Sequence, residues 1–498
     1  MREQIDSLQS QLDWFKRQLF GHKSEKRPAL EHDQAALFER TAADAKLGEQ
    51  TVTVPEHKRR KHRSGDEVNE AGLRFTEDVP VRTIRLSCPE LDGPDADQYE
   101  IIDYKESLRL ARQPGSHVVL RYERPVIRAK ADGTITTVAA PLGVLDHAQV
   151  DVSMLAGLLI DKFQWHLPLY RQHQRLAAEG ITLAPATIEA WVKRTVELLG
   201  PVAAAIKAAI VSGDYLKVDE TPIKAGRMKS SSGQGKMKTG WLWPILGEHG
   251  DIAFTYSEER GAKVVRELLG EQFKGTIQTD GYEIYARYAA KQPECTHALC
   301  WAHTRRTFIK AEAGEPQVVG QALEMIRALY KIEKELRDHG ADSETILATR
   351  TELSEPIVDK FFGWVNEQIA DPGLLPKSPL ARALNYARER EAGLRVFLKD
   401  AWVALDTNDL ERALRVVPMG RKNWMFCTSE LGARHVAIVQ TIIATCRAHG
   451  IDTYTYLVDV LLRINQHPAN KIDELTPRQW QQRFAADPLR SDLVTTGQ

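Results

Sequence analysis

Hydrophobic residues recur at different spacings in successive parts of the chain. Between residues 3 and 20 they alternate in steps of three and four, the narrow seam of a helix that pairs either with another copy or with the protein's own body. Residues 28–70 are polar and lack a period. Residues 73–150 alternate apolar and polar positions in short runs between Gly and Pro, which predicts a small antiparallel β-module. Residues 151–200, and those after about 300, have a helical period.

The stretch 213–310 changes to alternating strands and helices. The pattern predicts the order β-β-β-α-β-α-β, with strands at 215–218, 239–246, 252–257, 276–279 and 296–299 and helices at 262–269 and 282–289. This order matches a ribonuclease-H-like core, in which parallel strands extend a three-stranded antiparallel meander. In such a core the first and fourth strands are neighbours, an expectation that rests on fold-level analogy.

The segment 167–191 contains a helix that stops at Gly180 and a second helix that opens near Pro185. Proline suits the first turn of a helix. Two helices joined by a Gly-containing turn predict a helix-turn-helix, which can place its second helix in a DNA major groove. A plain helical hairpin has the same spacing, so both interpretations stay open.

Composition narrows the class of protein. A chain of 498 residues with 43% hydrophobic and 27% charged residues is a soluble globular protein of roughly three or four units. Its formal net charge of −1 excludes a global basic field, so any DNA contact has to come from local patches. Five scattered cysteines suit a reducing compartment. With neither a signal-peptide pattern nor an apolar stretch near ~20 residues, we expect a cytoplasmic protein outside the membrane.

Two aspartates carry the candidate chemistry. Asp219 and Asp280 each follow a short apolar strand, and if those strands are neighbours the two carboxylates meet at one sheet edge. Clustered carboxylates repel one another, and a divalent cation such as Mg²⁺ removes that penalty. Paired Mg²⁺ ions can activate an attacking oxygen and stabilise a leaving one in phosphoryl transfer. Either aspartate alone is explained equally well as a turn residue.

A glutamate from a downstream helix could complete a three-carboxylate site. Glu411 shares its helix with two arginines and precedes the basic segment 420–424, a neighbourhood suited to anions. The alternative is Glu333, in an amphipathic helix whose many i,i+4 charges favour a solvated face. The preference for Glu411 makes residues 313–400 an all-helical insertion in the core.

Cysteine and histidine alternate between Cys295 and His303. A strand sends Cys295 and His297 to one face and Cys300 to the other, and no second CxxC pair completes a tetrahedral site, so we expect no zinc here. We expect Cys300 and His303 to pair at a strand–helix junction, with His303 near the carboxylates.

Nearly the whole chain resembles transposases of the insertion-sequence 66 type, through the order and number of short motifs. They are the coil ending in Arg17-Gln-Leu-Phe-Gly-His-Lys-Ser-Glu-Lys26, then Leu167-Pro-Leu-Tyr-Arg171 with Trp191, Val218-Asp-Glu-Thr-Pro222, Thr279-Asp-Gly-Tyr282, Cys300-Trp-Ala-His303, Leu329-Tyr-Lys-Ile-Glu333, Ala383-Leu-Asn-Tyr386, Asn408-Asp-Leu-Glu-Arg412, Gly420-Arg-Lys-Asn-Trp424 and Tyr454-Thr-Tyr-Leu457. The chain departs from the family in having Cys88 alone where members carry paired CxxC motifs, Thr407-Asn408 in place of two asparagines, and a short N-terminal helix.

The resemblance implies a DDE-type transposase of the bacterial cytosol, associated with the nucleoid. Two Mg²⁺ or Mn²⁺ ions would be held by Asp219, Asp280 and Glu411, with His303 in the catalytic site. The enzyme would cut double-stranded DNA at the element's terminal inverted repeats and join the freed 3′ end to target DNA. It would act as a homo-oligomer on DNA, with or without accessory proteins of the same element. Alternatives are a DNA-binding protein that has lost catalysis and a ribonuclease-H-like nuclease without strand transfer.

The expected architecture is an α/β multi-domain protein. Its parts are an N-terminal coiled-coil helix (1–27), a basic linker (28–72), the β-module as a degenerate zinc-finger-like DNA-binding region (73–150), the helix-turn-helix-like segment (151–205), the catalytic core (206–312 and 401–425), the helical insertion (313–400) and a C-terminal helical domain (426–498). Basic side chains in the linker and around the core are the candidate DNA contacts. They are Lys58, Arg59, Arg60, Lys61, Arg227, Lys229, Lys236, Lys238, Arg305, Arg306, Arg412, Arg415, Arg421 and Lys422.

Overall fold

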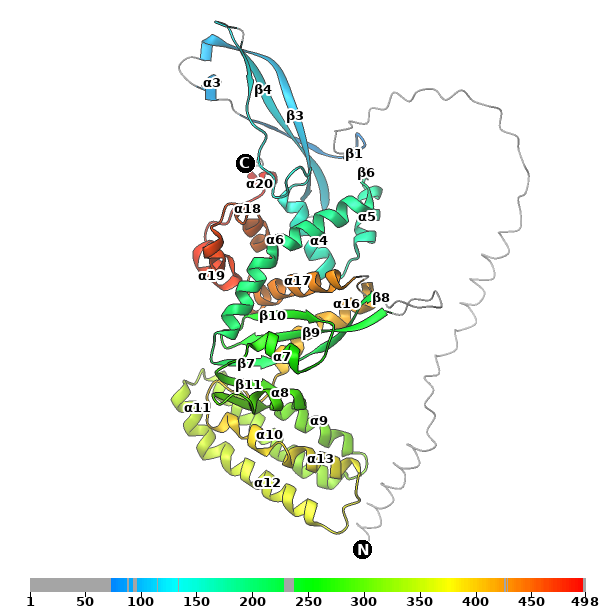
Figure 1. The fold of residues 1–498 in the computed structure, drawn as a ribbon, viewed down its shortest axis with the longest axis vertical. Helices are drawn as coiled ribbons and strands as arrows, with labels where there is room; N and C mark the ends of the chain where they lie inside the picture. The colour runs from blue at the N-terminus through cyan, green and yellow to red at the C-terminus, as the bar shows by residue number, and fades with distance from the viewer. Residues whose placement is uncertain are drawn as a thin grey trace, which may run out of the picture.

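A computed structural model of the chain describes residues 73–495, with the exception of 87–88, 93–95, 114, 133, 228–236, 425–426 and 428. The described part is elongated, with a β-arm at one end, a sheet with helices in the middle and a helical layer at the other end (Figure 1). The predicted N-terminal helix and basic linker, with Lys58, Arg59, Arg60 and Lys61, lie outside the described residues, as do Lys229 and Lys236. Within the described ranges no helix is both long and apolar enough to cross a bilayer.

The β-arm corresponds to the predicted β-module. Its elements are β1 (Arg74–Phe75), β2 (Val81–Arg85), α3 (Pro89–Asp92), η2 (Ala96–Gln98), β3 (Tyr99–Gln113), β4 (Ser116–Ala129) and β5 (Ile135–Thr137). The prediction of a purely antiparallel module was wrong, because β2 pairs with β4 in parallel while β3 and β5 pair with it antiparallel. The connection through α3 and η2 carries the chain past β4, so that β2 and β3 lie on opposite sides of it.

Three helices connect the arm to the sheet: α4 (Val152–Phe163), α5 (Leu169–Ala178) and, after the short strand β6 (Ile181–Thr182), α6 (Pro185–Val211). The predicted stop at Gly180 and start at Pro185 are confirmed. Gly180 has φ +83°, and a Cβ there would lie 2.4 Å from the Thr76 hydroxyl, so the turn requires glycine. The second helix has 27 residues and one buried face that packs on α17, so α6 is a helix of the core. A role in the major groove stays a prediction for its opposite face.

The central sheet follows the predicted strand order. Its elements are β7 (Tyr215–Val218), β8 (Thr221–Arg227), β9 (Met237–Gly247), β10 (Ile252–Ser257), α7 (Ala262–Leu269), β11 (Gly275–Thr279), α8 (Glu283–Ala289), β12 (Cys295–Leu299) and α9 (Trp301–Ala311). The strands lie in the order β10-β9-β7-β11-β12, with β7, β11 and β12 parallel and β7, β9 and β10 antiparallel. The first and fourth predicted strands, β7 and β11, are therefore neighbours.

Strand β8 was not predicted. It pairs antiparallel with the first half of β9 and contains Pro222 and a bulge beside Gly226, which has φ +72°. In the sequence, the proline and the glycine predict a loop at this position. The predicted loop 227–240 is therefore shorter than expected, because β9 already begins at Met237.

The predicted insertion is helical. It forms a layer under β11 and β12, made of α10 (Pro316–Asp338), α11 (Ser343–Thr349), a π-helix η3 (Arg350–Ser354), α12 (Glu355–Ala370), α13 (Pro379–Arg388), α14 (Glu391–Leu394) and η4 (Val396–Leu398). Its core is aromatic and separate from the main one: Trp301 packs edge-on against Phe361 and Phe397 and donates its indole N–H to the Leu394 carbonyl at 2.9 Å. The chain then returns to the sheet at α15 (Asn408–Leu414).

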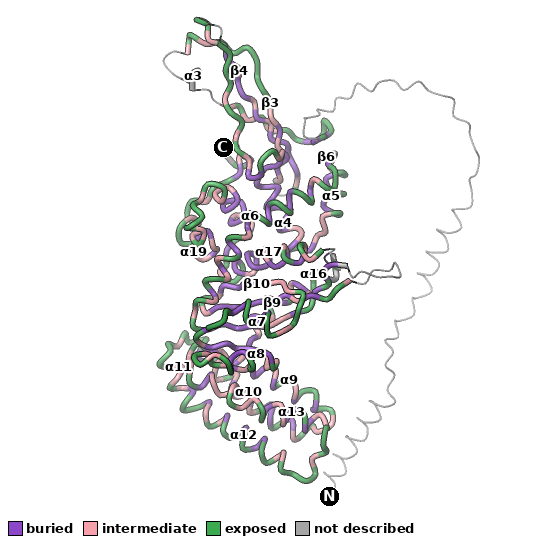
Figure 2. Tube along the Cα trace, viewed as in Figure 1, coloured by how far each residue is buried: buried purple, intermediate pink, exposed green. Residues whose placement is uncertain are grey.

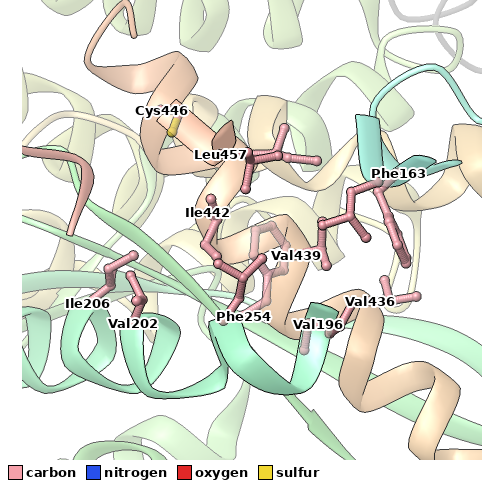
Figure 3. Close-up of a cluster of buried hydrophobic side chains, with 14 of the residues drawn as sticks. Phe163, Val196, Val202, Ile206, Phe254, Val436, Val439, Ile442, Cys446 and Leu457 are labelled. Atoms are coloured by element: carbon pink, nitrogen blue, oxygen red, sulfur yellow. The ribbon is translucent and has the colours of Figure 1, made fainter. Parts of the chain in front are cut away.

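The C-terminal part is helical, as predicted, and covers the sheet. It contains α16 (Val416–Trp424), α17 (Glu430–Ala448), α18 (Thr453–Arg463), η5 (Ala469–Leu475), α19 (Pro477–Arg483) and α20 (Asp492–Thr495). Figure 3 shows α17 side chains such as Val439 and Ile442 meeting Phe254 of β10 and Val202 of α6. The main core lies between these elements, which Figure 2 shows as buried.

Two threonines of helix α17 form hydrogen bonds with the backbone groups along the outer edge of strand β10. The Thr441 hydroxyl accepts from the Phe254 N–H at 2.9 Å. The Thr445 hydroxyl accepts from the Ile252 N–H at 3.0 Å and donates to the Ile252 carbonyl at 2.8 Å, as a neighbouring strand would. Because all these groups are buried, losing the hydroxyl leaves backbone atoms without partners.

We predict that Thr445→Val destabilises the protein by about 1–3 kcal/mol, because it leaves a buried N–H and carbonyl unsatisfied at nearly constant side-chain volume. Urea unfolding followed by tryptophan fluorescence measures the change. The matched control is Thr351→Val, whose exposed hydroxyl donates to the Leu347 carbonyl at 3.0 Å within its own helix and is expected to change stability by less than about 0.5 kcal/mol. If the two variants had equal urea midpoints of unfolding, Thr445 would not stabilise the edge of β10.

Candidate active site

Asp219 and Asp280 lie at the ends of two paired parallel strands. Asp219 follows β7 and Asp280 follows β11, and the register pairs Lys217 with Gln278. Because neighbouring strands are about 4.8 Å apart and these two end at the same sheet edge, the two aspartates lie side by side. Each side chain also accepts a local backbone bond, from Glu220 N–H at 2.7 Å and from Tyr282 N–H at 2.8 Å. These bonds orient both carboxylates at the start of their loops.

Glu411 from α15 is within electrostatic reach of the pair. Burial, together with the carboxylates of Asp280, Glu220 and Glu411, raises the pKa of Asp219 to about 7. At neutral pH Asp219 therefore carries its charge only part of the time unless a cation compensates for the neighbouring acids. The four carboxylates come from β7, β11 and α15, which are far apart in the sequence.

Two side chains of α9 contact Glu411. The Arg306 guanidinium donates to both its carboxylate oxygens, one at 2.7 Å, and His303 Nε2 lies 3.6 Å from the carboxylate. Burial and the adjacent Arg306 lower the pKa of His303, and its Nδ1 is buried with no hydrogen-bond partner among the described residues. Cys300 and His303 lie at the junction of β12 and α9, and the Cys300 sulfur accepts from the Thr407 N–H at 3.4 Å and from the His303 backbone.

Glu333 lies elsewhere. Its carboxylate is held by two bonds of 2.8 and 2.7 Å from Arg350, which is 2% exposed and also donates to the Phe397 and Asp400 carbonyls. The prediction that Glu333 lies on a solvated helix face was wrong, because Arg350 of the π-helix η3 contacts its carboxylate. Glu333 is therefore part of an ion pair inside the helical layer and is not among the acids that act on Asp219.

Several residues that support the site were missed in the sequence. The Glu220 side chain, 2% exposed, accepts from Arg260 at 3.0 Å and from the Tyr285 hydroxyl at 2.6 Å. Arg260 lies between the rings of Trp241 and Tyr282, with its guanidinium carbon 4.6 and 4.1 Å from their centres. Glu220 and Tyr282 adjoin the two aspartates in sequence, which was an available signal, whereas Arg260 stands in a loop with no local pattern.

Helix α13 of the helical layer fixes the loop that carries Asp280. The Tyr386 hydroxyl donates to the Asp280 carbonyl at 2.8 Å, and Arg390 donates to the Gly281 carbonyl at 3.3 Å while stacking on Tyr386. Gly281 has φ +94°, and a Cβ there would lie 2.8 Å from Arg390 Nε. Behind the loop, His297 Nε2 lies 2.9 Å from the Thr279 hydroxyl, and burial lowers the pKa of His297 to about 4.

Those predicted DNA contacts whose side chains the structure describes have different surroundings. Lys238 pairs with Glu430 at 2.9 Å and Glu258 at 3.6 Å, and Arg306 is engaged with Glu411. Arg305 is exposed on α9, whereas Arg412 and Arg415 line a cavity beside α15. The side chains of Arg227, Arg421 and Lys422 lie outside the described residues.

The acids fit a divalent cation only in part. Carboxylates are the ligand type that Mg²⁺ prefers, and two of them suffice when water or substrate phosphate supplies the rest. However, no group of three His, Cys, Asp or Glu side chains among the described residues has a metal-binding arrangement. The Glu411 carboxylate is bonded to the Arg306 guanidinium.

Comparisons with known proteins agree with one another. The family description "Transposase IS66 family" matches residues 147–435, "IS66 C-terminal element" matches 441–478, and "Transposase C of IS166 homeodomain" matches 7–83. The Drosophila P element transposase strand transfer complex aligns with a TM-score of 0.32 and 10% identity over 59% of this chain and 93% of that one, a likeness too weak to carry an argument.

Curated relatives come from Sinorhizobium fredii. The protein y4hP is 33% identical over 71% of this chain, which spans 66% of that relative's length, and y4jD is 30% identical over 73% of this chain and 72% of its own. Both are described as uncharacterized proteins. The first family match includes all the acids above, the sheet, the helical layer and the start of α17. This chain belongs to the IS66 family of transposases.

Proposed function

We propose that this protein is a DDE-type DNA transposase with a ribonuclease-H-like core interrupted by the helical layer. The observation that carries the proposal is the meeting of Asp219 and Asp280 at the ends of paired parallel strands, with Glu411 in electrostatic reach. The chain would cut at the inverted repeats of a mobile element and join the freed ends to target DNA. Double-stranded DNA is the substrate, and a homo-oligomer, with any accessory proteins of the element, is the acting form.

Asp219 and Asp280, joined by Glu411, would hold two Mg²⁺ or Mn²⁺ ions. Such ions, when bound, activate the attacking oxygen and stabilise charge on the leaving oxygen. Water attacks the phosphodiester at the element's end and releases a 3′-hydroxyl, which then attacks a target phosphodiester in line. No covalent bond to the protein forms in either step.

Arg306 and His303 act beside the acids in this proposal. Arg306 donates to both Glu411 oxygens from one nitrogen, Nη2, and its Nη1 lies 3.1 Å from His303 Nε2. A phosphate would compete for the same guanidinium, because it too accepts charge-assisted N–H bonds. An arriving DNA phosphate would draw Arg306 away and free Glu411. His303 is held neutral by burial, so its ring can accept a proton near the reacting oxygens.

We predict that Asp219→Asn and Asp280→Asn each reduce cleavage at least a thousandfold, because an amide holds a divalent cation far less well than a carboxylate. The assay follows Mn²⁺- or Mg²⁺-dependent 3′-end cleavage of a duplex carrying the element's inverted repeats, and joining into a second duplex separates a transposase from a simple nuclease. Both variants are expected to bind the duplex about as well as the wild type. Substantial cleavage by either variant would remove the aspartates from the mechanism.

The third acid is tested by comparing Glu411→Gln with Glu333→Gln. We expect Glu411→Gln to lose cleavage while thermal stability stays near that of the wild type, because Glu411 is partly exposed. Glu333→Gln is expected to lower stability, because it weakens the ion pair with buried Arg350, and to leave cleavage measurable in the folded fraction. An active Glu411→Gln protein together with an inactive, stable Glu333→Gln protein would reverse the assignment.

The raised pKa of Asp219 predicts pH-dependent metal binding. Only the ionised carboxylate binds a cation, so as the pH falls below about 7 the apparent Mg²⁺ affinity is expected to drop by up to about tenfold per pH unit. Titration of Mn²⁺ or Mg²⁺ by calorimetry at pH 6 and pH 8 measures this. Asp219→Asn should abolish the pH dependence; a wild-type affinity that is equal at both values would contradict it.

A further inference from the structure

A second cavity lies behind α15, away from the acids. It has a volume of about 840 Å³ and lies between the loop after α4, the sheet and helices α15 to α17. Asp409 and Arg412 of α15 line it, whereas Glu411 between them turns to Arg306. Its lining includes Tyr215 and Lys217 of β7, the strand that Asp219 follows. We call it the tryptophan pocket.

Two exposed tryptophans line the tryptophan pocket. Trp165 is 66% and Trp402 is 60% exposed, and they are the only exposed tryptophans among those whose side chains the structure describes. The others lie in the cores or, like Trp241, under a stacked arginine. Leaving two large rings in water at one cavity is unfavourable unless a ligand covers them. Trp165 precedes α5 and Trp402 follows the helical layer, so two separate segments present the rings.

Cations surround the same cavity. Arg412, Arg415 and Arg447 line it, and within the described ranges none of them makes an ion pair. Two acids also line the pocket: Asp409 pairs with Lys217, another lining residue, at 2.6 Å, and Glu248 accepts from the Asp214 N–H and lies 3.4 Å from His249. Three guanidinium groups without carboxylate partners give the tryptophan pocket a positive field suited to phosphate.

A buried histidine in the lining also lacks a partner. His166 is 9% exposed, and its Nδ1 makes no hydrogen bond among the described residues. Its backbone has φ +57°, a strained conformation for a residue other than glycine. An unpaired buried nitrogen held in a strained backbone beside a cavity is what a polar ligand group would satisfy.

We propose that the tryptophan pocket binds a stretch of single-stranded DNA, with bases stacked on Trp165 and Trp402 and phosphates on Arg412, Arg415 and Arg447. Stacking needs the face of a base, which a base pair inside a duplex does not offer, so unpaired nucleotides fit this lining. The chain's own basic segment 57–63 does not, because the pocket is itself cationic. The inference rests on the proposed function in that DNA is the substrate.

The chemistry proposed at the acids provides a source of unpaired nucleotides, because a cleaved strand end can separate from its complement. Along β7 the nearest lining residue, Lys217, stands two residues before Asp219, which is about 7 Å at ~3.3 Å for each residue. A few nucleotides extend that far. The tryptophan pocket would then hold the strand next to the cut while the acids hold the scissile phosphate.

The test is binding of a fluorescein-labelled 12-nucleotide oligothymidylate to the full chain without divalent metal, so that no cleavage is needed. We expect Trp402→Ala and Trp165→Ala each to weaken binding about tenfold or more, and Trp402→Phe to restore most of the loss because a phenyl ring still stacks. Arg447→Gln should make the slope of log affinity against log salt shallower by about 0.7. Tyr170→Ala, which removes a 69% exposed ring outside the pocket, is the matched control.

The outcomes separate this inference from the proposed function. Equal oligothymidylate affinity in wild type, Trp165→Ala and Trp402→Ala overturns the inference, as does an equal loss in Tyr170→Ala. Duplex cleavage by a protein that does not bind the oligothymidylate also overturns it and leaves the proposed function intact. Pocket-dependent binding in a protein that never cleaves DNA supports the inference and removes the proposed function.

Discussion

The parallel pairing of β7 with β11 is the constraint on which the rest of the site depends. The Thr276 N–H donates to the Asp214 carbonyl at 2.7 Å, and this contact starts the ladder that ends at Asp219 and Asp280. The approach is so close that a Cβ on Gly275, which has φ +112°, would lie 2.1 Å from the Asp214 oxygen. Only glycine permits this register, and a shift by one residue would turn one aspartate to the other face of the sheet.

Bringing acids together at the sheet edge has an electrostatic cost, and the surrounding residues reduce it. Arg260 neutralises Glu220 from a position between two aromatic rings, and Arg306 neutralises Glu411. Asp219 makes no ion pair among the described residues, and burial, together with the neighbouring carboxylates, raises its pKa. The repulsion that remains between the carboxylates is what the proposed divalent cations would relieve.

Helix α15 separates two chemically different surfaces. One side presents Glu411 to the acids and to α9, and the other presents Arg412 to the tryptophan pocket. The helical layer contributes to the first surface, because Tyr386 and Arg390 fix the Asp280 loop. An insertion of this kind therefore positions residues of the site as well as enlarging the protein.

Local sequence determined the strands, helices and turns wherever the signal lies within a few residues. The apolar runs before Asp219 and Asp280, the stop at Gly180 and the long helices after 300 are set by periodicity and by glycine and proline, and they were predictable. Strand β8 was not, because its proline and bulge look like a loop until β9 pairs with it. The parallel pairing of β2 with β4 was missed because strand direction depends on how a connection crosses the sheet.

Tertiary structure alone decided which charges meet. Glu333 and Glu411 both occupy helices with basic neighbours. Only the fold shows that Glu333 pairs with Arg350, whereas Glu411 lies within electrostatic reach of Asp219. Arg260, Tyr386 and the two tryptophans of the pocket likewise carry no local signal. Their roles arise because long-range packing brings together side chains hundreds of positions apart, and electrostatic interactions depend on that distance through space, which a sequence does not record.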